Sequence, residues 1–127
     1  MENFYKEASE VTPRISFDYA TAKLVFSGHS IPEDVESFFS PFLDYLNSYA
    51  ANPKPVTEVV FNFDYYNSAS LRVVLDIFFI LKNINDKEGC SVDISWYFDA
   101  DDDVVKENGE DMAFATGLNI NIIPKQL

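Results

Sequence analysis

"TEVVFNFDYYNSASLRVVLDIFFILK", residues 57–82, contains the change of hydrophobic period that decides the fold. Apolar and polar residues largely alternate from 57 to 65, which is typical of a β-strand with one packed face. From Ser68 onward, apolar residues recur every three or four positions, which is typical of an amphipathic helix. The packed faces are predicted to carry Val59, Phe61, Phe63 and Tyr65 on the strand, and Leu71, Val74, Leu75, Phe78 and Leu81 on the helix. The stretch therefore predicts a strand that leads directly into a helix.

The same two patterns recur along the chain. Alternation predicts further strands at 14–18, 23–27, 91–98 and 119–123, and helical spacing predicts helices at 31–50 and 101–116. The first two strands are separated by a short turn and should form a hairpin. The later strands are separated by helices and should be parallel, with right-handed crossovers. We expect the helix at 31–50 to start at Pro32 and to kink or break at Pro41. The helix at 101–116 should stop at Gly117.

The alternation also predicts how many faces of the sheet are covered. Strands buried on both faces are continuously apolar, whereas all five strands here alternate. We therefore expect an α/β fold in two layers: a mixed five-stranded sheet with helices mainly on one face, in a single domain spanning 1–127. Exposed positions on the open face should be Glu58, Asn62, Asp64, Asp93 and Ser95; buried positions under the helices should be Phe61, Phe63, Ile94 and Trp96.

Composition excludes several classes of function. The chain has 9 Lys and Arg against 21 Asp and Glu, a net charge of -12, which disfavours binding to nucleic acid or to anionic membranes. The longest apolar run, from Val73, is interrupted by Asp76, so no membrane span is expected. Cys90 is the single cysteine, which excludes a disulfide within the chain and a thiolate zinc cluster. We expect a soluble cytoplasmic protein.

Polar residues follow two of the predicted strands, where the carboxyl ends of parallel strands usually form the functional edge. These segments are YYNSAS at 65–70 and FDADDD at 98–103, and they should be neighbours in space. Ser68 could be a nucleophile, a helix cap or a phosphate acceptor. The chain has one histidine, His29, and no G-x-S-x-G turn, which disfavours a nucleophile. A cap at an exposed helix start that doubles as a phosphate acceptor is favoured.

The acidic segment could instead hold a metal ion. Its members are Asp99, Asp101, Asp102 and Asp103, without the spacing or the distal Glu of an EF-hand loop. Acidic residues are also favoured at helix starts by the exposed N–H groups there. We therefore expect no metal and no cofactor, and a small metal-dependent enzyme is the least favoured alternative.

Several blocks of the sequence resemble known signalling proteins. NSASL at 67–71 is similar to the D-S-S-G-L signature of STAS-type anti-anti-sigma proteins, whose first serine is a phosphate acceptor. Most of the chain resembles the SiaC family of bacterial regulatory phosphoproteins. The matching blocks are TPRISFD at 12–18, GHSIPED at 28–34, FNFDYYNSAS at 61–70, WYFDADDD at 96–103 and ENGED at 107–111. In this resemblance Ser68 stands where threonine is common, and Asn67 replaces the aspartate of the STAS signature.

The resemblance implies a STAS-like superhelix and a non-enzymatic switch. A dedicated Ser/Thr kinase would phosphorylate Ser68, and a PP2C-type phosphatase would remove the phosphate. The unphosphorylated form, a monomer when free, would bind and regulate a diguanylate cyclase or another output protein. The implied partner surface comprises Tyr65, Tyr66, Asn67, Ser68, Ser70, Arg72, Asp99, Asp101 and Asp102. An anti-anti-sigma factor of the STAS type is the alternative.

Overall fold

The computed structural model describes residues 1–125 as one six-stranded sheet with three helices. In chain order the elements are β1 (Phe4–Lys6), β2 (Arg14–Asp18), β3 (Lys23–Ser30), α1 (Val35–Ala51), β4 (Val56–Tyr66), α2 (Ser68–Asn85), β5 (Ser91–Asp99), α3 (Asp103–Thr116) and β6 (Ile120–Lys125). No helix within the described residues is long and apolar enough to cross a membrane.

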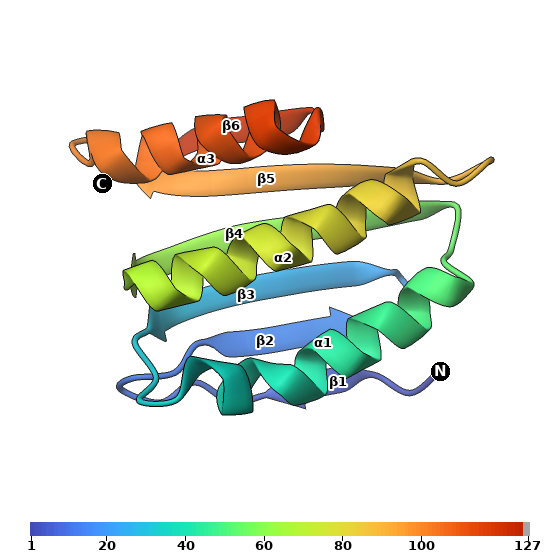
Figure 1. Cartoon of the computed structure of the whole chain (residues 1–127), viewed down its shortest axis with the longest axis horizontal. Coiled ribbons are helices and arrows are strands. Elements are labelled where there is room, and N and C mark those ends of the chain that lie inside the picture. The colour runs from blue at the N-terminus through green and yellow to red at the C-terminus, as the bar shows by residue number, and fades with distance from the viewer. Residues whose placement is uncertain (126–127) are drawn as a thin grey trace.

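The strands lie in the sheet in their sequence order, β1-β2-β3-β4-β5-β6. β1, β2 and β3 pair antiparallel, and β3 to β6 pair parallel. Because each crossover moves to the next strand in the same direction, right-handed connections place every helix on one face. Figure 1 shows α1, α2 and α3 side by side over that face. The predicted two-layer α/β architecture is therefore confirmed, while its STAS-like assignment stays a prediction.

The prediction of five strands is wrong, because β1 adds a sixth at the edge. Its three residues pair with β2, Phe4 opposite Phe17. Phe4 also packs against two rings of α1, with its centroid 5.3 Å from that of Phe42 and 5.4 Å from that of Tyr45. Three residues are too few to show a period of two, so alternation could not reveal this strand.

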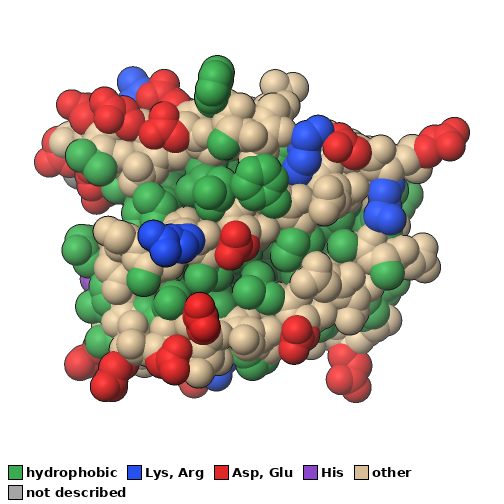
Figure 2. All heavy atoms as spheres, viewed as in Figure 1, with side chains coloured by type: hydrophobic (Ala, Val, Ile, Leu, Met, Phe, Trp, Pro, Cys, Tyr) green, Lys and Arg blue, Asp and Glu red, His purple; other side chains and the backbone are tan. Residues whose placement is uncertain are grey.

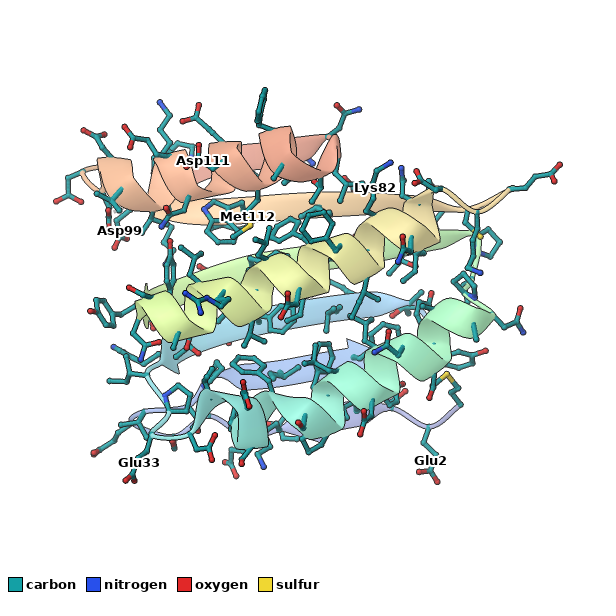
Figure 3. The ribbon with its side chains drawn as sticks, viewed as in Figure 1. Glu2, Glu33, Lys82, Asp99, Asp111 and Met112 are labelled. Carbon is teal, nitrogen blue, oxygen red and sulfur yellow. The ribbon has the colours of Figure 1, made fainter. Side chains whose placement is uncertain are left out.

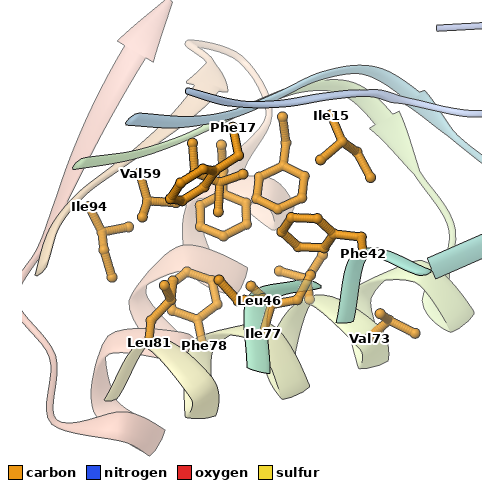
Figure 4. Packing of buried hydrophobic residues seen from close by; sticks show 14 of the residues in the cluster. Ile15, Phe17, Phe42, Leu46, Val59, Val73, Ile77, Phe78, Leu81 and Ile94 are labelled. Atoms are coloured by element: carbon orange, nitrogen blue, oxygen red, sulfur yellow. The ribbon is translucent and has the colours of Figure 1, made fainter. Parts of the chain in front are cut away.

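The core lies between the sheet and the helices and is rich in aromatic side chains (Figure 4). The ring of Phe61, at the centre of β4, stacks on Phe26 of β3 and on Phe78 of α2, each at a centroid distance of 4.8 Å. The ring centroid of Trp96 of β5 lies 5.5 Å from that of Phe61. The four residues predicted to be buried, Phe61, Phe63, Ile94 and Trp96, are all buried.

The opposite face of the sheet carries no helix among the described residues (Figure 1). Asp64 and Asp93 are exposed there, as predicted, whereas Glu58, Asn62 and Ser95 are only partly exposed. The Oδ1 atom of Asn62 is buried and has no hydrogen-bond partner in the described part of the chain. The polar side chains of the open face thus differ in how far they are exposed.

Two predicted helix starts differ from the structure. α1 begins at Val35, not at Pro32, because the Asp34 side chain caps it by accepting from the Ser37 N–H, which lowers the pKa of Asp34. The helix continues through Pro41 without a break, and a kink at this residue stays a prediction. α3 begins at Asp103, two residues later than predicted, since Asp102 is its cap. Its predicted end at Gly117 is confirmed: this residue has a φ of 73°, the left-handed conformation that glycine adopts without strain.

Candidate functional site

The junction of β4 and α2 places Ser68 on the surface at the first position of the helix. Asn67 is the cap, since its Oδ1 accepts from the Ser70 N–H at 2.9 Å. The prediction that Ser68 itself caps α2 is therefore wrong. The Ser70 N–H bonds to the cap and the Leu71 N–H bonds to the Asn67 carbonyl. The N–H groups of Ser68 and Ala69 have no intrahelical acceptor, as at any helix start, and stay available to solvent or an anion.

A β-bulge in β4 sets which tyrosine reaches the surface. Phe63 pairs with Gly28 and Tyr65 pairs with His29, so Asp64 is an extra residue in β4. The extra residue inverts the alternation beyond it. Tyr65, predicted on the packed face, is instead 57% exposed. Tyr66 turns to the packed side, where its ring lies 6.1 Å from Trp96 and is half-buried.

A buried pair of hydroxyl groups holds the start of α2 to the end of β3. The Ser30 hydroxyl donates to Ser70 Oγ at 2.8 Å, and the Ser70 hydroxyl donates to the Ser30 carbonyl at 2.8 Å. The Asn67 N–H donates to the same carbonyl at 3.1 Å. Ser70 is completely buried, so it cannot belong to the surface that a partner touches, and its place among the predicted surface residues is wrong. Its role is to position the turn that carries Ser68.

Ser68 lies where two surface hollows meet. The larger, of about 520 Å³, runs between the first turns of α1 and α2. Its lining is Val35, Glu36, Phe39, Ser40, Leu43, Ser68, Ala69, Arg72, Val73 and Asp76. The smaller, between α2 and α3, is lined by Ser68, Leu71, Arg72, Leu75 and Met112. Met112 lies between these two helices in Figure 3. Apolar side chains are visible in both hollows in Figure 2.

The acidic segment lies beside the tyrosines, as predicted. A third hollow is lined by Phe63, Asp64, Tyr65, Tyr66, Asp102, Val104, Val105 and Asn108. Asn108 Nδ2 donates to the Tyr66 hydroxyl at 2.7 Å, which joins α3 to the end of β4. Burial raises the pKa of Tyr66, the charge of Asp102 adds to that rise, and the bond from Asn108 opposes it. Asp99 and Asp101 are exposed at the same edge; Asp99 is labelled in Figure 3 at the end of β5.

This geometry supports neither a serine nucleophile at Ser68 nor a metal site in the acidic segment. The Asp102 carboxylate accepts from the Val105 N–H at 3.1 Å and is engaged as the cap of α3. Within residues 1–125, no three His, Cys, Asp or Glu side chains gather closely enough to hold a metal ion. His29 is exposed and pairs with Tyr65 through the backbone, and no hydrogen bond joins its ring to Ser68 in this part of the chain. What the site presents is an exposed hydroxyl at a helix start, beside aromatic and acidic side chains.

The sequence profile of the SiaC family, described as regulatory phosphoproteins, matches residues 6–125. The chain belongs to the SiaC family. An uncharacterized protein of Pseudomonas aeruginosa (strain UCBPP-PA14) is 24% identical over 111 residues, which is 87% of each chain.

Solved structures share the fold of this SiaC-family chain. Apo-SiaC from Pseudomonas aeruginosa matches with a TM-score of 0.86 at 22% identity, over 97% of this chain and 99% of that one. The crystal structure of the diguanylate cyclase SiaD in complex with its activator SiaC, from the same organism, contains a chain that matches with the same TM-score and identity. The match covers 96% of this chain and 99% of that one. The agreement over nearly the whole length identifies the six-stranded, one-sided sheet as the fold of these SiaC structures.

Two residues of the site in this SiaC-family member were missed by sequence reasoning. Ser30 continues the alternation of β3 beyond the predicted end at residue 27, and its burial would have required extending that strand. Asn108 lies in the ENGED block and gives no local sign that it reaches Tyr66, 42 residues earlier. Both contacts depend on the packing of distant elements.

Proposed function

We propose that this SiaC-family protein is a non-enzymatic signalling switch that binds and regulates a partner protein when Ser68 is unphosphorylated. The partner we propose is a diguanylate cyclase, because the similar SiaC from Pseudomonas aeruginosa is described as the activator of the diguanylate cyclase SiaD. A Ser/Thr kinase would transfer the γ-phosphoryl group of ATP to Ser68 Oγ, with release of the hydroxyl proton. A PP2C-type phosphatase would hydrolyse the phosphoserine with water, in the cytoplasm, where ATP is available.

The single observation that carries this proposal is the placement of Ser68. It is exposed at the first position of α2, and it lies on both hollows that flank this helix. A kinase can therefore reach its hydroxyl without unfolding the helix. A partner that fills either hollow would also cover the hydroxyl, so modification and binding would compete for one surface.

The partner surface that we propose combines the end of β4, the first turns of α2 and the loop before α3. Its residues are Tyr65, Tyr66, Asn67, Ser68, Arg72, Asp99, Asp101 and Asp102. This edge is already acidic, and Figure 2 shows Asp and Glu side chains gathered over the start of α3 and along α1. A phosphate adds about 1.5 to 2 negative charges at pH 7. A partner suited to the unmodified acidic surface would then meet excess charge and lose affinity.

Calorimetry with the cognate diguanylate cyclase tests the switch. The unmodified protein should bind, and protein with phosphoserine at position 68 should bind at least tenfold more weakly, equivalent to about 1.4 kcal/mol. Ser68→Ala should bind like the wild type and resist the kinase. Ser68→Asp carries at most half the charge of a phosphate and should fall between the two forms.

A matched control separates the site from overall charge. Ser48→Asp adds the same charge on α1 at an exposed position that lines none of the hollows described, and it should bind like the wild type. Equal affinity of the phosphorylated and free forms for the cyclase would refute the switch.

A further inference from the structure

Ser68 and Arg72 lie four residues apart on α2, and so they are neighbours on one face of the helix. Both line the hollow between α1 and α2, and both line the hollow beside Met112. Arg72 is exposed and forms no ion pair within residues 1–125. The guanidinium group is therefore within reach of position 68 and is not engaged by another charge.

The charges around this pair are otherwise negative. Glu36 of α1 and Asp76 of α2 line the same hollow, and neither lies within 4.0 Å of Arg72 as an ion pair. In the described part of the chain, the lining of the hollow beside Met112 adds no further charged side chain. Among residues 1–125, Arg72 is thus the one cation in the lining of either hollow. An acid placed four residues before a base is also the favourable order for a pair on a helix.

We propose that Arg72 receives the phosphate of phosphoserine 68 within the same chain. The proposal rests on the proposed function, in which Ser68 is the acceptor, and it specifies what the phosphate does there. A guanidinium group can donate two parallel hydrogen bonds to a phosphate. The N–H groups of Ser68 and Ala69, which have no intrahelical acceptor, are further donors for the same phosphate.

The pairing gives phosphorylation two effects on the partner surface. The phosphate adds negative charge, and it also removes Arg72 from use by a partner. The hollow between α1 and α2 is then left with Glu36 and Asp76 as its remaining unpaired charges. A partner that places a carboxylate on Arg72 therefore loses that contact. Added negative charge alone would not remove Arg72 from the partner.

The test uses the whole chain with phosphoserine incorporated at position 68 during translation, so that neither a kinase nor a cyclase is needed. Phosphorus NMR follows the second pKa of the phosphate, which is about 6 in an unpaired phosphoserine. A nearby cation stabilises the dianion and lowers this pKa. We expect the pKa in Arg72→Gln to be roughly half a unit above that of the otherwise unchanged chain, since an exposed pair is weakened by solvent.

Two variants make the comparison specific. Lys82→Gln removes the same charge from the other end of α2 (Figure 3), about 21 Å along the helix from Ser68, and it should leave the phosphate pKa unchanged. Arg72→Lys keeps the charge and should restore most of the shift. Equal phosphate pKa values with and without Arg72, or equal shifts in Arg72→Gln and Lys82→Gln, would overturn the pairing.

The pairing and the proposed function can fail separately. A shift that depends on Arg72, together with unchanged cyclase binding on phosphorylation, would uphold the pairing and refute the switch. Weakened cyclase binding without that shift would uphold the switch and refute the pairing.

Discussion

At the residue scale, Ser68 was predicted to be both the cap of α2 and a phosphate acceptor, but the cap is Asn67. Asn67 caps α2, so Asn67→Ala should lower the free energy of unfolding by about 1 kcal/mol, within a range of roughly 0.5 to 2. Ser68→Ala should change it by less than about 0.5 kcal/mol, because an exposed surface substitution removes no capping bond. Urea denaturation of both variants measures the difference. A larger loss for Ser68→Ala than for Asn67→Ala would reverse the assignment of the cap.

The buried hydroxyl pair predicts coupling between Ser30 and Ser70. Ser70→Ala removes the acceptor of the Ser30 hydroxyl and should cost roughly 1 to 3 kcal/mol, the cost of leaving a buried polar group unsatisfied. Replacing both serines by alanine should cost less than the sum of the two single changes, since no hydroxyl is then left without its partner. A double-mutant cycle by chemical denaturation gives this coupling. Strict additivity would show that the two hydroxyl groups act independently.

Tyr66 should make stability depend on pH in the alkaline range. Because burial raises its pKa in the folded state, the folded protein holds this proton more tightly than the unfolded chain does. The resulting stabilisation is complete below the unfolded pKa, near 10, and is lost as the pH rises from there through the folded pKa. Between pH 8 and pH 11, Tyr66→Phe should therefore lose less of its free energy of unfolding than the wild type. If the free energies of unfolding of the wild type and Tyr66→Phe fall equally over this range, Tyr66 does not cause the pH dependence.

At the element scale, the contact between α3 and β5 depends on a residue without a side chain. A Cβ atom on Gly109 would lie 2.5 Å from Cδ1 of Trp96, a distance that forces a displacement. Trp96 also donates its Nε1–H to the Val105 carbonyl at 2.9 Å, so its ring is held against α3. The helix accepts the poor helix-former Gly109 because the close approach requires it.

Gly109→Ala should consequently destabilise the protein although alanine favours helix. We expect a loss of roughly 1 to 3 kcal/mol from overpacking, against a gain of up to about 1 kcal/mol from helix propensity. Thermal unfolding followed by circular dichroism measures the net change. In a Trp96→Phe background the smaller ring should relieve the clash, so a penalty unaffected by that background would place its cause elsewhere.

At the scale of the whole molecule, one sheet face and three helices share a single core, and Phe61 lies at its centre. Its ring stacks on Phe26 and Phe78 and contacts Trp96. Phe61→Ala should cost about 3 to 5 kcal/mol, a large part of the roughly 5 to 15 kcal/mol that stabilises a typical domain. Phe114, which is 91% exposed on α3, supplies the matched control, and Phe114→Ala should change the free energy of unfolding by less than about 0.5 kcal/mol. Similar losses for both variants by denaturant titration would contradict a single core.

The sequence by itself determined the two-layer architecture of this protein, apart from the short edge strand β1. Alternation within strands and helical spacing between them predicted the parallel strands, the hairpin and the one covered face, because hydrophobic period is a local property that the burial of one face imposes on each element. The stop at Gly117 was equally local, since the left-handed conformation favours glycine wherever the rest of the chain lies. The sequence also indicated where Ser68 should lie, at the carboxyl edge of the sheet.

Only the tertiary structure decided the details that make this edge a site. The bulge at Asp64, which exposes Tyr65 and turns Tyr66 inward, arises from how β4 pairs with β3, and the order of apolar and polar residues from 57 to 65 does not reveal it. The cap at Asn67 rather than Ser68 is a contact between residues three apart, but it depends on where the extended backbone of β4 gives way to α2. The burial of Ser70 against Ser30 depends on side-chain geometry between segments 40 residues apart. Contacts of that kind result from which elements pack together, and a local pattern of residue types carries no information about them.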